Sequence, residues 1–249
     1  MNIVKGILGR ILAVWAALLF IVTMLPVALI IWILGLVKEP KRIELFIRLS
    51  KIWMSVYLFM IGCRLKLKGL SNFKKGQNYI IIYNHNSLMD IVVTTPFIPG
   101  ANKTIAKAEL AKVPVFGLLY KRGSVLVDRK DKNSRANSFK GMAEVLALGM
   151  HMCIYPEGTR NMTGNPLKEF HSGAFKLAVQ TGTPILPALI FNTGNALPAD
   201  KKFFLWPAVF EVHYLPQVNV SPGDDYEELK NNLFQLMSSY YVAHQNDQG

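Results

Sequence analysis

The feature that most constrains this chain is an uncharged apolar run from Ile11 to Val37. It covers 27 consecutive positions, among which Thr23 is the only hydroxyl-bearing residue. Because a helix needs about 20 apolar residues to cross the hydrocarbon core of a bilayer, this run is long enough to span a membrane. It is too long for the apolar core of a signal peptide, and no small-residue cleavage site follows it. Pro26 lies in its middle and removes a helix hydrogen bond, so two arrangements stay open: a kinked span, and a segment that enters the bilayer and stays on one side.

A second helical segment is predicted from Ile43 to Cys63. Its first half interleaves charged with apolar residues, and its second half carries no charge. This pattern favours a helix that packs on the first and lies partly in the membrane interface. We therefore predict that residues 1–62 are membrane-anchoring helices and that residues 63–249 form a second domain. An ordinary buried pair of helices is the alternative, which the nearly complete lack of a polar face in the first run disfavours.

Charge is distributed unevenly along the chain. The 249 residues carry a formal charge of +12, and residues 64–140 hold fifteen Lys and Arg against four Asp and Glu. This concentration indicates an anionic surface or substrate. Nucleic acid is not expected as a partner, because zinc-finger, homeodomain and RNP motifs are absent from the sequence. The two cysteines, Cys63 and Cys153, lack the spacing of a metal site and are expected to be buried, reduced thiols.

Beyond residue 63, strand patterns alternate with helical ones. Such alternation predicts an α/β fold with a mixed, largely parallel sheet flanked by helices. The predicted strands are 64–69, 79–83, 103–107, 124–127, 151–155, 184–190 and 209–215. Helices are predicted directly after the loop at residues 84–87, from 108 with an interruption at Pro114, and over 135–149, 173–182 and 224–241.

The predicted strand 79–83 ends just before His85, and Asp90 follows five positions later. In a helix this spacing would turn the two side chains about 140° apart, so they can meet only if His85 lies before the helix and Asp90 in its first turn. Ser87 is the predicted N-cap of that helix. A carboxylate beside a histidine fixes its tautomer and stabilises its cation. His85 is therefore a candidate general base with Asp90 as its orienting partner, although a solvated surface turn is the preferred interpretation of this stretch taken alone.

Other strand ends also carry reactive side chains. After the predicted strand 151–155 come Glu157, Gly158, Thr159 and Arg160. Gly158 permits an unusual backbone angle, Thr159 offers a hydroxyl, and the planar guanidinium of Arg160 binds phosphate or carboxylate. This is the pattern expected of an anion-binding loop, and a turn with a solvated arginine is the alternative. A third stretch, at residues 123–129, contains Asp-Arg. A fourth, at residues 183–190, contains Pro-Ile-Leu-Pro.

Taken in order, these four stretches resemble the four sequence blocks of the 1-acylglycerol-3-phosphate acyltransferase family of membrane glycerolipid acyltransferases. The stretches read Asn-His-x4-Asp, Gly-x4-Asp-Arg, Tyr-Pro-Glu-Gly-Thr-Arg and Pro-Ile-x-Pro. The resemblance covers roughly residues 66–215, and the N-terminal helices are similar to the two-helix membrane motif of that family. Small departures occur at Tyr155, Asn161 and His171, and the last leaves the anion contacts of residues 168–171 open.

The resemblance implies a function. His85 and Asp90 would be catalytic, and Lys107, Arg129, Glu157, Gly158, Thr159 and Arg160 would bind the glycerophosphate group. The expected reaction moves an acyl group from acyl carrier protein or coenzyme A to the sn-2 hydroxyl of lysophosphatidic acid and gives phosphatidic acid. No cofactor or metal is expected. The expected location is the cytoplasmic membrane, among its lipids, with the active site facing the cytoplasm.

Three alternatives stay open from the sequence. The same chemistry on another lysolipid is the nearest. A non-catalytic protein that binds anionic lipid with its basic segment is a second, but it gives no reason for His85 and Asp90 to stand together. A metal hydrolase is disfavoured, because no further cluster of ligand-type residues completes a coordination sphere in the sequence.

Overall fold

The computed structural model describes residues 3–128, 130–201 and 203–246. Within these residues, seven strands form one sheet in the order β1-β7-β6-β2-β5-β3-β4. All neighbouring pairs are parallel except β6 with β7, which is antiparallel. The predicted mixed, largely parallel sheet is therefore confirmed. The strands are β1 (Arg64–Lys68), β2 (Ile80–Tyr83), β3 (Asn102–Lys107), β4 (Ser124–Val127), β5 (His151–Ile154), β6 (Ile185–Phe191) and β7 (Val209–Tyr214).

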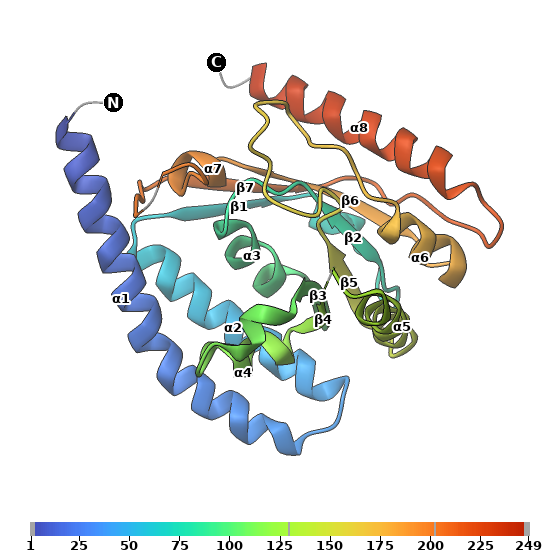
Figure 1. Ribbon diagram of the computed structural model, residues 1–249, viewed down its shortest axis with the longest axis horizontal. Coiled ribbons are helices and arrows are strands. Elements are labelled where there is room, and N and C mark those ends of the chain that lie inside the picture. Colours follow the sequence, from blue (N-terminus) through green and yellow to red (C-terminus); the bar gives the residue numbers. More distant parts are fainter. Residues whose placement is uncertain (1–2, 129, 202, 247–249) are drawn as a thin grey trace.

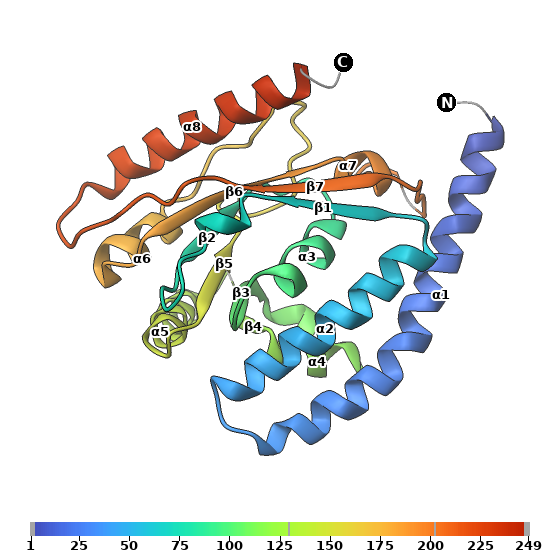
Figure 2. The same cartoon turned by 180° about the vertical axis from the view of Figure 1, so that it is seen from behind.

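Helices cover both faces of the sheet (Figures 1 and 2). Alternate side chains of β2 enter two different cores, one with Ile80 and Ile82 and the other with Ile81 and Tyr83. The helices α4 (Phe116–Arg122), α5 (Lys132–Ala147), α6 (Gly173–Thr181) and α8 (Tyr226–Asn246) contribute to the first core. The helix α3 (Met89–Val93) contributes to the second, and α1 (Ile3–Ile33) and α2 (Lys41–Met60) contribute to both. A four-residue helix, α7 (Thr193–Ala196), follows β6.

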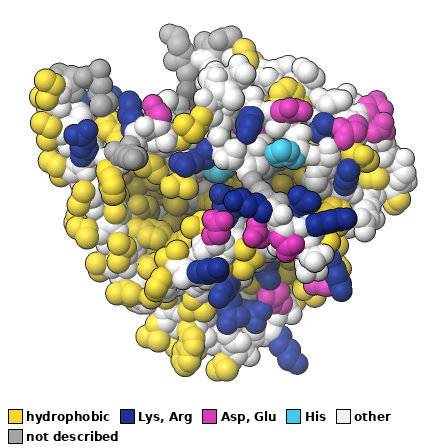
Figure 3. Space-filling view, viewed as in Figure 1, with side chains coloured by type: hydrophobic (Ala, Val, Ile, Leu, Met, Phe, Trp, Pro, Cys, Tyr) yellow, Lys and Arg dark blue, Asp and Glu magenta, His cyan; other side chains and the backbone are white. Residues whose placement is uncertain are grey.

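The long apolar run forms α1, which continues through Pro26 and curves around α2 (Figure 1). The break that Pro26 could have introduced does not occur. By length and composition, α1 and the short 3-10 turn after it (Ile3–Leu36) could cross a membrane, and only 28% of its most apolar 18-residue stretch is buried. Its outward face is almost continuously hydrophobic, as the space-filling view shows (Figure 3).

Both N-terminal helices also contribute to the interior of the protein. Ile31 and Ile43 are buried in one core, and Ala13 and Tyr57 in the other. An ion pair between Glu39, in the connection between α1 and α2, and Lys103 of β3 has Nζ–Oε distances of 2.9 and 3.0 Å. The two helices are thus packed onto the α/β part along their length.

Two local predictions were wrong in detail. The N-cap of α3 is Leu88 and not Ser87. The Ser87 hydroxyl nevertheless accepts a hydrogen bond from the Met89 amide at 3.2 Å. The segment from Ala108 forms a 3-10 turn (Ala108–Lys112), and α4 begins only at Phe116. Pro114 explains this second difference, because a proline lacks the amide hydrogen that a continuous helix would need.

Candidate active site

The candidate residues lie where neighbouring parallel strands end. β2 leads to His85, β5 to Glu157, and β3 ends at Lys107. Since β2, β5, β3 and β4 are adjacent and parallel, their carboxyl ends lie on one edge of the sheet. In open α/β sheets this edge is where ligands bind. The sheet order therefore explains why blocks far apart in the sequence converge.

The His85–Asp90 pair is formed as predicted. Nδ1 of His85 lies 2.8 Å from Oδ2 of Asp90, whose side chain is fully buried in the first turn of α3. The same oxygen accepts the amides of Asn86 and Ser87 at 2.7 and 2.9 Å. Because a carboxylate only accepts hydrogen bonds, the imidazole proton belongs on Nδ1. Nε2 then carries a lone pair, and it makes no hydrogen bond within the described part of the chain.

Glu157 ties two loops together beneath this pair. Its Oε1 accepts the His85 amide at 2.8 Å, and its Oε2 accepts the Lys168 amide at 3.1 Å. Its side chain is fully buried. Burial raises its pKa to about 7, and the two backbone hydrogen bonds oppose that rise. Glu157 thus fixes the position of the His85 backbone from a turn 72 residues further along the chain.

Further contacts hold the histidine ring in place. The His85 and Tyr155 rings lie 4.7 Å apart, and the Tyr155 hydroxyl lies 2.9 Å from that of Thr94. The Asn161 amide donates to the His85 carbonyl at 2.6 Å. His85 is therefore held on its ring face, at Nδ1, and at both backbone atoms, while its side chain keeps 16% of its surface exposed. A reactive group held in this way is preorganised for proton transfer.

The described members of the predicted anion-binding set lie at or after the ends of β3 and β5, on the same edge of the sheet. Gly158 has φ 71°, in the left-handed region that glycine adopts without strain. Thr159 is exposed, Arg160 is half-buried, and Lys107 is exposed at the end of β3. Arg129 lies outside the described residues.

Comparison with known proteins decides the family. The sequence model of the acyltransferase family matches residues 64–191. A 1-acyl-sn-glycerol-3-phosphate acyltransferase of Borreliella burgdorferi is 31% identical over 205 residues, which are 78% of this chain and 78% of the relative. The chain belongs to this acyltransferase family, and it is an enzyme.

Other members of the acyltransferase family agree. The 1-acyl-sn-glycerol-3-phosphate acyltransferase of Cocos nucifera is 36% identical over 75% of this chain, and the alpha form of Mus musculus is 30% identical over 67%. This chain spans about 60% of the length of each of these two relatives. The crystal structure of the 1-acyl-sn-glycerophosphate (LPA) acyltransferase PlsC from Thermotoga maritima has a TM-score of 0.79, with 97% of this chain and 98% of that chain covered. At 22% identity this likeness shows a shared fold.

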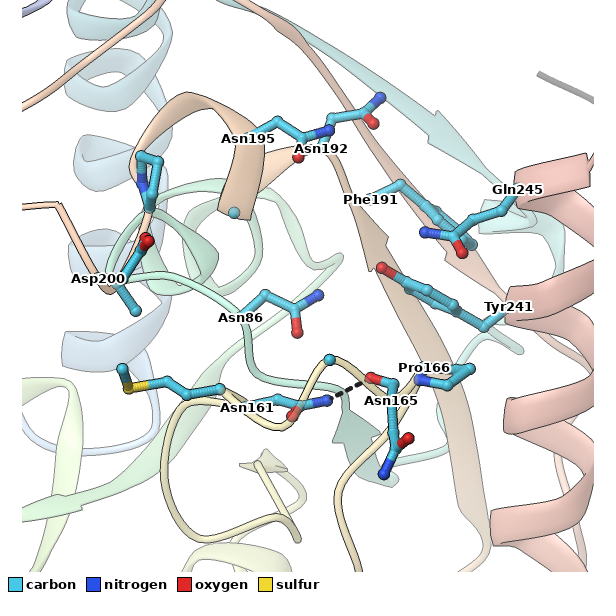
Figure 4. Close-up of a pocket in the computed structure, with 15 residues that line it drawn as sticks. Asn86, Asn161, Asn165, Pro166, Phe191, Asn192, Asn195, Asp200, Tyr241 and Gln245 are labelled. Carbon is cyan, nitrogen blue, oxygen red and sulfur yellow. Dashed lines mark hydrogen bonds between the residues drawn. The ribbon is translucent and has the colours of Figure 1, made fainter. Parts of the chain in front are cut away.

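One part of this edge of the acyltransferase was not predicted from the sequence. A cavity of about 440 Å³ lies beside the His85 loop, lined by Asn86, Asn161, Asn195, Tyr241 and Gln245 among others (Figure 4). Four of these five side chains are amides, which a sequence reading takes for ordinary loop and surface residues. They come from four segments of the chain, so no local motif indicates that they meet.

One group of residues in this acyltransferase has the composition of a metal site. Within the described residues, the ligand atoms of Glu211, His213 and His244 lie within 4.8 Å of one another. Glu211 is already paired with Lys68 at 3.2 Å and with the His213 ring at 2.9 Å. Two neighbouring lysines, Lys66 and Lys68, oppose a further cation there, so we read the group as an ion-pair network between β7 and α8.

Proposed function

We propose that this acyltransferase moves an acyl group from a thioester donor, acyl carrier protein or coenzyme A, to the sn-2 hydroxyl of lysophosphatidic acid and so forms phosphatidic acid. The observation that carries the proposal is the 2.8 Å contact between His85 and Asp90. It lies at the carboxyl edge of the sheet, where Arg160 and Lys107 also lie. The family relationship and the activities for which the relatives are named support the proposal.

In this mechanism Nε2 of His85 accepts the proton of the sn-2 hydroxyl while the hydroxyl oxygen attacks the thioester carbon. Asp90, which holds Nδ1–H, stabilises the resulting imidazolium. The tetrahedral intermediate then collapses, the carbon–sulfur bond breaks, and the imidazolium returns the proton to the departing thiolate. The products are the ester and a free thiol. No covalent acyl-enzyme is needed.

The cationic residues position the acceptor. Arg160, Lys107 and Arg129 would bind the phosphate, so that the sn-2 hydroxyl reaches His85 in one orientation. Gly158 would let the backbone come close to the phosphate, and Thr159 would contribute a hydroxyl. Glu157 has a different part, since both of its oxygens accept backbone amides: it would serve substrate binding indirectly, by holding the His85 loop against the loop that carries Lys168.

Residues 1–62 would anchor this enzyme to the membrane, with residues 63–249 as the catalytic part. The packing favours an arrangement on one side of the bilayer. The carbonyl of Gly9, near the start of α1, accepts the Leu205 amide at 2.9 Å, and Ile31, near its end, is buried in the core. Because α1 is attached to the catalytic part at both ends, a membrane-spanning α1 would place the catalytic part inside the bilayer as well. We infer that α1 lies in the cytoplasmic leaflet and that the active site faces the cytoplasm.

A panel of acceptors tests the proposed substrate. Purified enzyme should acylate lysophosphatidic acid and should be much slower with monoacylglycerol, which lacks the phosphate. Arg160→Ala should raise KM for lysophosphatidic acid about tenfold or more, the effect of losing one hydrogen bond to a charged group, and should leave monoacylglycerol unaffected. Equal rates with both acceptors would contradict lysophosphatidic acid as the substrate and would favour another lysolipid as the acceptor. Binding to anionic vesicles without any acyl transfer would favour the non-catalytic lipid-binding alternative.

A further inference from the structure

The cavity beside the catalytic loop differs in character from the phosphate side of the site. Its described lining residues include no lysine or arginine, and its one charged member, Asp200, is acidic and exposed. The described lining therefore offers no cationic partner to an anionic group such as the phosphate of the acceptor. Six lining residues carry amide side chains, with the rings of Phe191 and Tyr241 and two prolines between them. Such a wall suits a neutral chain that carries its own amide groups.

Loops from both sides of β2 wall this cavity. β2, which leads to His85, lies between β6 and β5. The wall residues within 161–166 follow β5, whereas Phe191 ends β6, Asn192 follows it, and α8 crosses above (Figures 1 and 4). The cavity therefore adjoins the His85 loop, and its described lining residues are uncharged apart from Asp200.

The cavity is also close to the reacting residues. Asn86, which lies on its wall, directly follows His85, and its amide binds Asp90. Asn161 lies on the same wall, and its backbone amide donates a hydrogen bond to the His85 carbonyl. In Figure 4 Tyr241 points toward Asn86. Burial raises the pKa of the Tyr241 hydroxyl, and the Asn86 side chain opposes that rise, so the hydroxyl lies against the residue that follows His85.

Several of the amides are unused by the fold. The side chains of Asn165, Asn195 and Gln245 make no hydrogen bond to protein atoms within the described residues, and all three are exposed at the rim. By contrast, the Asn161 side chain is committed to Thr163 and the Asn165 carbonyl. The cavity volume falls in the range of about 300–1,000 Å³ that small organic ligands occupy.

We propose that this cavity binds the pantetheine arm of the acyl donor. The inference rests on the proposed function, because that reaction needs a thioester at His85. Both candidate donors, coenzyme A and acyl carrier protein, carry the acyl group on the same arm, a neutral chain with two amides.

Two variants on the cavity test this assignment. The double variant Asn195→Ala, Gln245→Ala removes two unused amides from the rim. Gly194→Leu adds bulk to the wall, since a Cβ at Gly194 would lie 3.5 Å from the Asn86 Cβ and meets nothing closer. Asn232→Ala, an exposed amide on the same helix as Gln245 but outside the cavity, is the matched control. Each variant is assayed with acyl-coenzyme A, acyl carrier protein and acyl-pantetheine of one chain length.

The expected result is an increase in KM for all three donors by the same factor, about five- to tenfold for the double variant and more for Gly194→Leu. The KM for lysophosphatidic acid and all values of the control should stay at those of the wild type. An increase in the acceptor KM, an effect on only one donor, or no effect at all would overturn the assignment. Absence of any transfer by the wild type would instead contradict the proposed function itself, and the inference would fall with it.

Discussion

One carboxylate oxygen of Asp90 accepts three hydrogen bonds. Oδ2 binds the His85 ring and the amides of Asn86 and Ser87, whereas Oδ1 is buried and has no hydrogen-bond partner among the described residues. The two backbone bonds fix the turn that begins α3, and the same contacts aim Oδ2 at the imidazole. One buried carboxylate therefore both shapes the loop and orients the proposed base. Because an unpaired buried oxygen costs about 1–3 kcal/mol, this arrangement favours function over stability.

Glu157 gives a prediction about pH. Its pKa is raised from 4.5 to about 7, chiefly by burial, so the folded enzyme keeps a proton that the unfolded chain releases near pH 4.5. The stabilisation from this group is fully present below pH 4.5 and is lost as the pH rises through about 7. The free energy of unfolding of the wild type should therefore fall relative to Glu157→Gln between pH 5 and pH 8, by at most about 1.4 kcal/mol per pH unit. Urea unfolding of both proteins measures this; a difference that does not change with pH would contradict it.

The sequence could indicate the proposed catalytic pair because the two residues are five positions apart and lie in one stretch. It could not indicate the contacts of Glu157 with the His85 and Lys168 amides, since these join separate loops. For this residue the family resemblance implied a substrate contact. The neutral cavity could not be predicted for the same reason, as Asn86 and Tyr241 meet only through the packing of α8 over the strand ends.

At the scale of elements, the sheet was the most predictable part. Its strands are short and apolar on both faces, as in the fully buried β2, β5 and β6, and such runs differ clearly from their polar flanks. Helix boundaries were less predictable. α5 begins at Lys132 because the Asp131 side chain caps it by accepting the Asn133 and Ser134 amides, a signal that the apolar pattern over 135–149 does not contain.

The attachment of α1 depends on a close approach at Gly9. A Cβ at this position would lie 2.3 Å from the ring of Phe204, so only glycine fits without a shift of that ring. Gly9→Leu should destabilise the folded enzyme by about 1–3 kcal/mol through overpacking. Ala17→Leu adds a larger side chain to an exposed position of the same helix and serves as the control. Thermal unfolding in one detergent compares them, and equal midpoints for Gly9→Leu and Ala17→Leu would show that this contact does not hold the helix.

At the scale of the molecule, hydrophobic and charged surfaces are separated. The outward faces of α1 and α2 carry exposed apolar side chains, whereas lysines and arginines gather over the α/β part (Figure 3). This separation is typical of a protein that dips one side into a bilayer. Acyl chains could then reach His85 from the lipid while the donor approaches from water.

Labelling from one side of the membrane tests the depth of α1. Arg10 and Lys38 are exposed near the two ends of its apolar stretch, and the native Cys63 and Cys153 are buried. We expect Arg10→Cys and Lys38→Cys both to react with an impermeant maleimide in inside-out membrane vesicles, and neither to react in right-side-out vesicles. Reaction of the two positions from opposite sides would establish a membrane span instead.

The most direct test of the central claim is mass spectrometry of the lipid products of wild type and His85→Ala. Each purified enzyme receives an isotope-labelled acyl thioester, as coenzyme A or carrier-protein derivative, with a mixture of lysophosphatidic acid and other lysolipids. The wild type should form labelled phosphatidic acid, and His85→Ala, folded to the same thermal midpoint, should be slower by about 10²- to 10⁴-fold. Labelled phosphatidic acid formed at similar rates by both proteins would contradict the account.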